Sequence, residues 1–266
     1  MSETLTLCYH AVSRTWPASL AVTPEAFEEQ LERLLSRGYG PATFTAAARG
    51  EAPERALVVT FDDAFRSVLD LALPIMDRLG VPGTVFVPTA YPDSGRPMAW
   101  DGLDTWMAGP HEHELACIGW DELRSLRDAG WEVASHTHSH PYLTQVCDDE
   151  LRRELCRSRE VCERELGEPC STIAYPYGDT DHRVIAAARE AGYRQAAALD
   201  ARFRTGDPLR LPRVGVYRQD DRRRFALKTA RSLRAVRSSF AWQGVVAARR
   251  AVATHRVRLE GRLTGA

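Results

Sequence analysis

Short apolar runs alternate with polar, charged stretches along most of the chain. The apolar runs are typical of buried strands, and they predict strands at residues 5–9, 56–61, 83–87, 131–135, 171–174, 193–198 and 211–216. The stretches between them predict helices at about residues 24–37, 65–79, 121–129, 148–166 and 181–191. Alternating strands and helices favour a parallel sheet with right-handed crossovers, so we expect an α/β fold whose sheet is open or rolled into a barrel.

One stretch interrupts this alternation. A loop over about residues 88–119 is long enough to suggest a functional role. Trp100, Trp106 and Trp120 either stack on sugar rings or anchor the loop to the core. Residues 111–114, His-Glu-His-Glu, are interpreted as a solvated stretch of loop, with a second metal site as the alternative.

The chain changes character after Gln219. Arginines dominate residues 220–266 and alternate with apolar positions such as Phe225, Leu227 and Trp242. This pattern predicts a basic amphipathic helical tail that follows a catalytic domain at residues 1–219. The tail either packs on that domain, contacts an anionic membrane surface or binds a partner. Nucleic-acid binding is not expected, because no recognised nucleic-acid motif accompanies the charges.

Composition narrows the class of protein. The 266 residues carry a net charge of −1 and are 44% hydrophobic, which is enough for a substantial core. The first residues lack a basic segment followed by an apolar run, and the six cysteines form no Cys-x-x-Cys pair. We therefore expect reduced thiols and a cytoplasmic protein, with peripheral membrane contact through the tail as a variant of that location.

Two consecutive acids follow the strand at 56–61. Asp62 and Asp63 stand at the end of an apolar run, where an unpartnered carboxylate is costly to bury. Neighbouring side chains at a strand end point in different directions, so one carboxylate can bind a metal while the other faces substrate or water. The alternative is that one of them caps the next helix.

A histidine cluster follows the strand at 131–135. His136 and His140 are four residues apart, a common spacing of metal ligands, and with a carboxylate they suit Zn²⁺ or a similar divalent ion. His138 is expected to point away. A third strand ends in the turn Tyr175-Pro176-Tyr177-Gly178, which can turn a backbone N–H toward a developing oxyanion.

Taken together, Asp62-Asp63, His136-x-x-x-His140 and Pro176-Tyr177-Gly178 resemble the motifs of the NodB-like polysaccharide deacetylases, over about residues 4–216. The resemblance implies a distorted (β/α) barrel and hydrolysis of an acetylated sugar. It also implies that Asp62 is the general base, that Asp63, His136 and His140 bind one divalent metal, for which the ligand types favour Zn²⁺, and that the N–H of Tyr177 binds the oxyanion.

Two positions depart from the family pattern. Ala174 stands where the family often has an arginine that pairs with the base, and Arg213 is the candidate replacement. The family's acid histidine normally follows a late strand, whereas here His10 follows the first one. Some members resemble a circular permutation in which that strand comes first, so the resemblance implies that His10 is the general acid; the alternative is a structural histidine.

We therefore predict a metal-dependent hydrolase that removes an N-acetyl or O-acetyl group from a sugar, polysaccharide or glycan precursor. One alternative is a non-catalytic carbohydrate-binding or scaffold protein on the same fold, for which Ala174 is the main argument. Another is a hydrolase of a different non-peptide amide, because fold and motifs do not determine the substrate.

Overall fold

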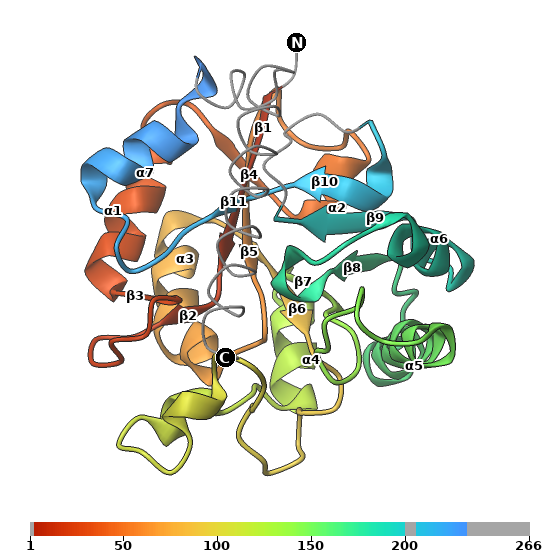
Figure 1. The fold of residues 1–266 in the computed structure, drawn as a ribbon. Helices are drawn as coiled ribbons and strands as arrows, with labels where there is room; N and C mark the ends of the chain where they lie inside the picture. Colours follow the sequence, from red (N-terminus) through yellow and green to blue (C-terminus); the bar gives the residue numbers. More distant parts are fainter. Residues whose placement is uncertain (1–2, 200–205, 233–266) are drawn as a thin grey trace, which may run out of the picture.

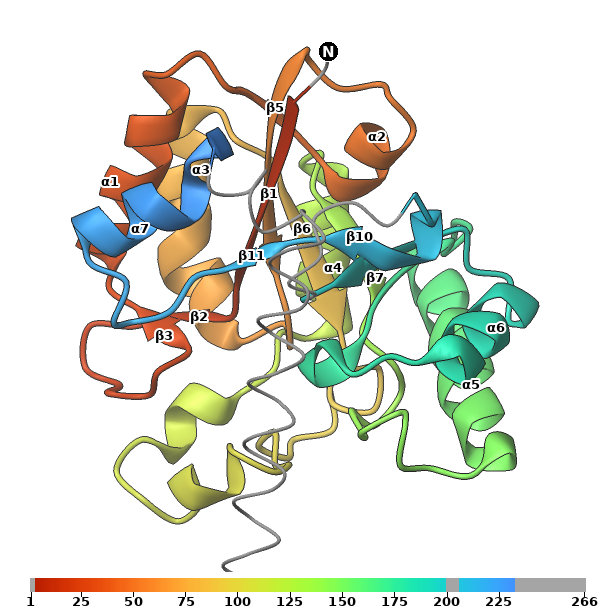
Figure 2. The same ribbon diagram turned by 45° about the horizontal axis from the view of Figure 1, so that its top comes forward.

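The computed structural model describes residues 3–199 and 206–232, and within these ranges nine strands form a parallel sheet that rolls into a nearly closed barrel (Figure 1). The helices lie around the outside of this sheet, as Figure 2 also shows. The predicted α/β barrel is therefore confirmed.

The strands follow one another around the barrel in the order β10-β9-β8-β7-β6-β5-β1-β11, and β4 adds to β5. All of their pairings are parallel, as the alternation of strands and helices predicts. The strands are β1 (Glu3–Tyr9), β4 (Gly40–Ala42), β5 (Arg55–Phe61), β6 (Gly83–Val87), β7 (Glu132–Ser135), β8 (Thr172–Ala174), β9 (Gln195–Ala198), β10 (Leu211–Pro212) and β11 (Val214–Gly215).

The barrel closes at Arg213. The sequence predicts a single strand at 211–216, but the chain bends there and forms two short strands at opposite edges of the sheet. Leu211 pairs with Ala197 of β9, whereas Val214 pairs with Leu7 of β1. Arg213 is the one residue between the two strands, and its side chain is buried. The seam of the barrel therefore carries a buried cation.

The helices are α1 (Pro24–Leu35), α2 (Phe44–Ala48), α3 (Leu73–Leu79), α4 (Trp120–Asp128), α5 (Asp148–Leu166), α6 (His182–Glu190) and α7 (Arg222–Thr229). Thr23 caps α1 by accepting a hydrogen bond from the Ala26 N–H at 3.2 Å, as its position before Pro24 predicts. The helix predicted at 65–79 begins as a π-helical turn, Val68–Ala72, and continues as α3. In the described ranges, no helix has the length and apolarity needed to span a membrane.

Several short elements escaped prediction. They are α2, β4 and the pair of strands β2 (Ala11–Val12) and β3 (Ala21–Val22). The long loop contains two 3₁₀ turns, Asp104–Trp106 and Glu112–Leu115. Elements of two to five residues leave little periodicity in a sequence, which explains why they were missed.

The core lies on both faces of the sheet. A large apolar cluster fills the space between the strands and the surrounding helices. A smaller cluster lies on the other face, where alanines of β7, β8 and β9 leave room for the ring of Phe86. The guanidinium of Arg213 lies 5.3 Å from the centre of that ring. In the barrel interior, the charged group of Arg213 thus lies directly against the apolar layer that contains Phe86.

The described part of the basic tail packs on the domain. Phe225 of α7 belongs to the large apolar cluster, and Arg222 reaches Glu29 of α1 at 3.1 Å. Figure 1 shows α7 beside α1. The remainder of the predicted tail, from residue 233, lies outside the described residues, and the boundary between 219 and 220 stays a prediction.

Candidate active site

The predicted site residues lie at the carboxyl ends of several strands of the barrel. Asp62 and Asp63 follow β5, His136 follows β7, and the turn at Tyr177 follows β8. In parallel barrels all of these ends meet at one rim, so residues far apart in sequence come together there. His10 follows β1, which lies between β5 and β11 at the same rim.

Asp63, His136 and His140 form a compact group of metal-ligand type. The Nε2 atoms of His136 and His140 lie 3.3 Å and 3.2 Å from Asp63 Oδ1. All three side chains are buried, and their ligand atoms lie within 4.8 Å of one another. His138 is outside the group, as expected, because its Nδ1 lies 2.9 Å from the Thr89 hydroxyl.

The residues of this group fit a divalent cation. Asp63 Oδ1 is buried, and among the described residues it has no hydrogen-bond partner of good geometry despite its two imidazole neighbours. Donor atoms about 3.2 Å apart match the spacing of ligands that bind one ion at about 2.0–2.2 Å. The Nδ1 atom of His136 lies 2.8 Å from the Ala174 carbonyl, to which it can donate its proton. That hydrogen bond leaves the Nε2 lone pair of His136 available to a metal.

Charge in this group is tightly coupled. Burial alone would raise the pKa of Asp63, but the charge of His140 and contacts with both histidines lower it. Burial lowers the pKa of His140 below its usual value, since the nearby carboxylates only partly offset it. For His136 the charges of Asp62 and Asp63 outweigh burial and raise the pKa. In the absence of an ion, His136 is therefore the histidine that more readily holds a proton against Asp63.

Asp62 pairs with Arg213 rather than with the histidines. The two guanidinium nitrogens donate to Oδ1 and Oδ2 at 2.6 and 2.7 Å, and Nη1 also donates to the Thr60 hydroxyl at 2.9 Å. Burial alone would raise the pKa of Asp62, but the charge and hydrogen bonds of Arg213, together with the charges of His136 and His10, outweigh it and lower that pKa to about 2. The structure thus places a cation on Asp62 although Ala174 occupies the position of the family arginine.

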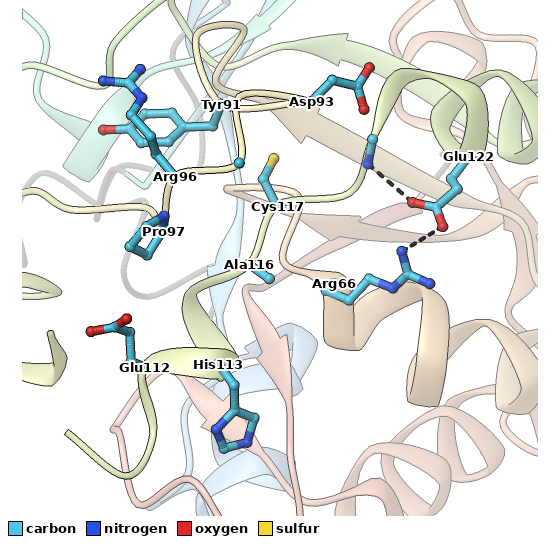
Figure 3. A pocket seen from close by; sticks show the side chains of 12 residues that line it. Arg66, Tyr91, Asp93, Arg96, Pro97, Glu112, His113, Ala116, Cys117 and Glu122 are labelled. Carbon is cyan, nitrogen blue, oxygen red and sulfur yellow. Dashed lines mark hydrogen bonds and ion pairs between the residues drawn. The ribbon is translucent and has the colours of Figure 1, made fainter. Parts of the chain in front are cut away.

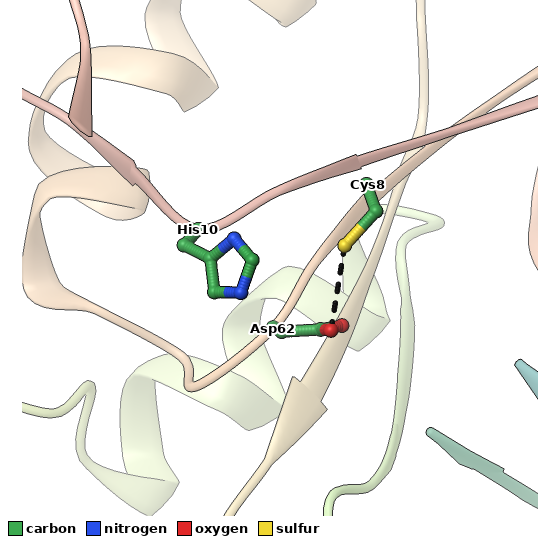
Figure 4. Close-up of side chains that lie close together, drawn as sticks. All are labelled: Cys8, His10 and Asp62. Atoms are coloured by element: carbon green, nitrogen blue, oxygen red, sulfur yellow. Dashed lines mark hydrogen bonds between the residues drawn. The ribbon is translucent and has the colours of Figure 1, made fainter. Parts of the chain in front are cut away.

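Asp62 also has neighbours from the first strand. The Cys8 thiol donates to Asp62 Oδ2 at 3.4 Å, and the His10 imidazole lies beside the same carboxylate (Figure 4). The ligand-type atoms of Cys8, His10 and Asp62 all lie within 4.8 Å of one another. Burial raises the pKa of the Cys8 thiol well above its usual value, so Cys8 is a neutral donor. His10 stacks loosely on Tyr217, with ring centres 6.5 Å apart.

The backbone is strained around the site. Of the seven described non-glycine residues with a left-handed conformation, five lie here: Asp63, Ala64, Thr137, His140 and Tyr177. Each such residue costs about 1–2 kcal/mol, so surrounding contacts must hold it in place. Such clustering is typical of functional sites rather than of structural turns.

Aromatic rings cover one side of the ligand group. Trp100, from the long loop, stacks on His140 with ring centres 4.0 Å apart. Tyr177 meets His140 edge-on at 4.7 Å and stacks on Tyr142 at 3.8 Å. Asp101 joins this wall by accepting a hydrogen bond from the Tyr142 hydroxyl at 3.0 Å. The loop therefore contributes directly to the surroundings of a candidate ligand.

The other residues singled out on the loop pack in the core or lie away from the candidate ligand group. Trp120 is buried in the core, and Trp106 packs edge-on against Trp16. Residues 111–114 belong to no group of potential metal ligands in the described part of the chain. A pocket of about 520 Å³ opens beside the loop (Figure 3) and contains the Cys117 thiol, 3.9 Å from the Asp63 carbonyl oxygen. None of the predicted site residues lines it.

Of two close neighbours of the site, the sequence analysis assigned no role to Cys8 and left two roles open for Trp100. Cys8 lay unremarked two residues before His10, although strand alternation places residues 8 and 10 on one face. Trp100 was one of three tryptophans in the loop, and no local signal distinguishes it from Trp106. Only the folded loop brings it onto His140.

Comparison with known proteins adds an independent line of evidence. The family model of polysaccharide deacetylases matches residues 49–196. This range contains Asp62, Asp63, His136, His140 and Tyr177, whereas His10 and Arg213 lie outside it.

Individual relatives agree with that match. The chain is 22% identical to poly-β-1,6-N-acetyl-D-glucosamine N-deacetylase of Staphylococcus aureus over 209 residues, which cover 73% of this chain and 67% of that protein. The curated relatives it matches are longer, and the chain spans 63–67% of their length. Its fold is similar to that of PplD of Streptococcus pyogenes, solved with acetate (TM-score 0.70, 21% identity, 86% of this chain and 98% of that one), and to IcaB of Ammonifex degensii (0.69, 22%, 86% and 98%).

Proposed function

This chain belongs to the polysaccharide deacetylase family, and we propose that it is a metal-dependent hydrolase of an N-acetylated or O-acetylated sugar, polysaccharide or glycan precursor. The observation that carries the proposal is the pair of adjacent carboxylates with divided tasks. Asp63 faces two histidines, whereas Asp62 faces Arg213 and His10. One carboxylate is thus placed to hold a cation and the other to move a proton.

Asp63, His136 and His140 would hold the ion, for which Zn²⁺ is our first choice because imidazole and carboxylate ligands suit it. When bound there, a divalent ion would lower the pKa of a water molecule and polarise the acetyl carbonyl. The substrate class follows from the relatives, one of which is named as a deacetylase of poly-β-1,6-N-acetyl-D-glucosamine.

Asp62 is assigned to proton removal from the attacking water. Its carboxylate is ionised at neutral pH because Arg213, with smaller contributions from His136 and His10, outweighs burial and lowers the pKa of Asp62 to about 2. A carboxylate with so low a pKa is a weak base, so it accepts a proton only as the attacking water becomes acidic in the transition state. Arg213 also fixes the carboxylate orientation through two parallel hydrogen bonds.

His10 and Tyr177 are assigned to the later part of the reaction. The Tyr177 N–H lies in the turn after β8 and would donate to the oxyanion of the tetrahedral intermediate. His10, when protonated, would donate to the leaving nitrogen as the C–N bond breaks. Its place after β1, beside β11, supports this role, because that position puts an imidazole at the same rim as Asp62.

The leaving group provides a test of His10. An amide nitrogen needs a proton to depart, whereas an activated ester oxygen does not. His10→Ala should therefore lower kcat/KM about 100-fold or more on an N-acetyl sugar and much less on an aryl acetate. Both substrates should be assayed with the same protein preparation. Equal losses on the two substrates would assign His10 a structural role.

The proposed function also accounts for the feature that favoured a non-catalytic protein. That alternative rested on Ala174, an uncharged residue at the position where the family often has an arginine. Because Arg213, between β10 and β11, pairs with Asp62, the site does not lack the cation. A hydrolase of another non-peptide amide would use the same groups, so only substrate assays separate that alternative.

Metal removal tests the proposal as a whole. We expect chelator-treated protein to release no acetate from β-1,6-linked N-acetylglucosamine oligomers, and one equivalent of Zn²⁺ or Co²⁺ to restore release. Acetate should be quantified by a coupled assay at equal protein concentration. Full activity of the metal-free protein would refute metal dependence. A metal-loaded protein that is inactive on these oligomers should be assayed on chitin oligomers, O-acetyl sugars and N-formyl amides.

A further inference from the structure

The loop between the two candidate histidine ligands rests on a carboxylate from a different element. Glu154 lies on α5, and its Oε2 accepts hydrogen bonds from the backbone N–H groups of His138 and Ser139, both at 2.8 Å. Its Oε1 accepts the Ser139 hydroxyl at 2.6 Å. One side chain therefore anchors two consecutive residues that stand between His136 and His140.

The Glu154 carboxylate is buried without a salt-bridge partner among the described residues, which is unusual for a contact that is only structural. It is 7% exposed, and within the described ranges it takes part in no ion pair of 4.0 Å or less, so hydrogen bonds from amide and hydroxyl donors are what chiefly offset its burial. A buried carboxylate without a cation is costly unless its hydrogen bonds are good. Other anchors of the loop include the amides of Thr89 and Ala90, which donate to the carbonyls of residues 137 and 138, and the Ser135 hydroxyl, which accepts from the Thr137 N–H.

The loop needs such support because its backbone is strained. Thr137 and His140 both adopt a left-handed conformation, with φ of 67° and 66°. The two histidines also differ in how they are held. His136 has a hydrogen bond from Nδ1 to Ala174, whereas His140 Nδ1 is buried and has no hydrogen-bond partner in the described part of the chain. The position of His140 therefore depends on the loop backbone and on the rings of Trp100 and Tyr177 that contact it.

We propose that Glu154 is a positioning residue that preorganises His140, relative to His136 and Asp63, for a divalent cation. This inference rests on the proposed metal-dependent function. A glutamine at this position would turn an N–H group toward the two backbone N–H donors, or leave them with a single weaker acceptor. The loop would then sample conformations in which His140 is displaced, and the metal would lose affinity without any change in its ligands.

The test compares Zn²⁺ affinity, by competition with a chromogenic chelator, in the wild-type protein, Glu154→Gln and Glu160→Gln. Glu160 is exposed on the same helix, so Glu160→Gln controls for the loss of one charge from α5. We expect Zn²⁺ binding about tenfold weaker in Glu154→Gln, as for other residues that orient metal ligands, and unchanged in Glu160→Gln. The visible spectrum of the Co²⁺-loaded protein should change in Glu154→Gln alone, since a distorted ligand set alters it.

Ser139→Ala keeps the proposal testable if Glu154→Gln does not fold. It removes only the hydroxyl bond to Oε1 and should weaken Zn²⁺ binding about two- to threefold, a fraction of the effect of losing the carboxylate. Wild-type affinity in Glu154→Gln, or in Ser139→Ala if only that variant folds, would overturn this inference alone. A wild-type protein that binds neither Zn²⁺ nor Co²⁺ would overturn the metal-dependent function and this inference with it.

Discussion

Replacing both His136 and His140 with alanine is expected to abolish metal binding and acetate release. The change removes two of the three protein ligands and leaves the buried carboxylate of Asp63 without its neighbours. Elemental analysis should find close to one Zn²⁺-like ion per wild-type chain and less than about a tenth of that in the variant, since one carboxylate is a poor site for such an ion. Acetate release should fall at least about 1,000-fold, which corresponds to about 4 kcal/mol of lost transition-state stabilisation.

The matched control lies inside the same loop. His138→Ala removes an imidazole that contacts the Thr89 hydroxyl and stands outside the ligand group. It should keep the metal, because the backbone N–H of residue 138 can still donate to Glu154. If the double variant retained a stoichiometric ion, Asp63, His136 and His140 would not be the ligands. If the wild-type protein could not be loaded at all, the non-catalytic alternative would become the better interpretation.

This contrast between His138 and its neighbours shows what spacing alone can predict. Four-residue spacing in a loop after a strand was sufficient to select His136 and His140, because both must reach a carboxylate at the rim of a parallel barrel. Glu154 could not be selected in the same way. Its helical spacing from Leu151 and Ser158 places it on the buried face of α5, unlike Glu160, but only the packing of α5 against the loop shows what it binds.

The fold shows the same division. β5 and α1 were predictable within a residue or two, because local sequence alone favours them. The β-branched apolar run Leu57-Val58-Val59 favours a strand, and the N-cap at Thr23 favours the start of a helix. The end of the barrel was not predictable, because the bend at Arg213 depends on pairing with two different strands, β9 on one side and the distant β1 on the other. Arg213 was a candidate from the sequence, but its contact with Asp62 exists only because the barrel closes there.

The Arg213–Asp62 pair should be strongly coupled in both stability and activity. It is fully buried, with two hydrogen bonds of 2.6 and 2.7 Å, so removal of either partner leaves an uncompensated charge or unsatisfied donors. Arg213→Met should lower the free energy of unfolding at pH 7 by about 3–5 kcal/mol, measured with urea. Arg194→Met, at an exposed arginine before β9, should leave it almost unchanged.

The pH dependence follows from the lowered pKa of Asp62. In the wild-type protein the pair contributes its full stabilisation above the unfolded pKa near 4, and this contribution is lost as the pH falls through about 2. Without Arg213, burial should raise the pKa of Asp62, and protonation then relieves the penalty as the pH falls. The stability difference between the wild-type protein and Arg213→Met should therefore shrink in acid. A difference that stayed constant between pH 7 and pH 4 would contradict this explanation.

Activity distinguishes the two partners. Asp62→Asn should retain the metal and lose about 10²–10⁴-fold in kcat, because an amide cannot accept the proton of the attacking water. Arg213→Met should also lose activity, because without the guanidinium the Asp62 carboxylate is misoriented and more easily protonated. The double variant should be no less active than Asp62→Asn and more stable than the sum of the single changes predicts, because an uncharged pair leaves no buried ion. Additive losses in the double variant would mean that Arg213 acts on the substrate rather than through Asp62.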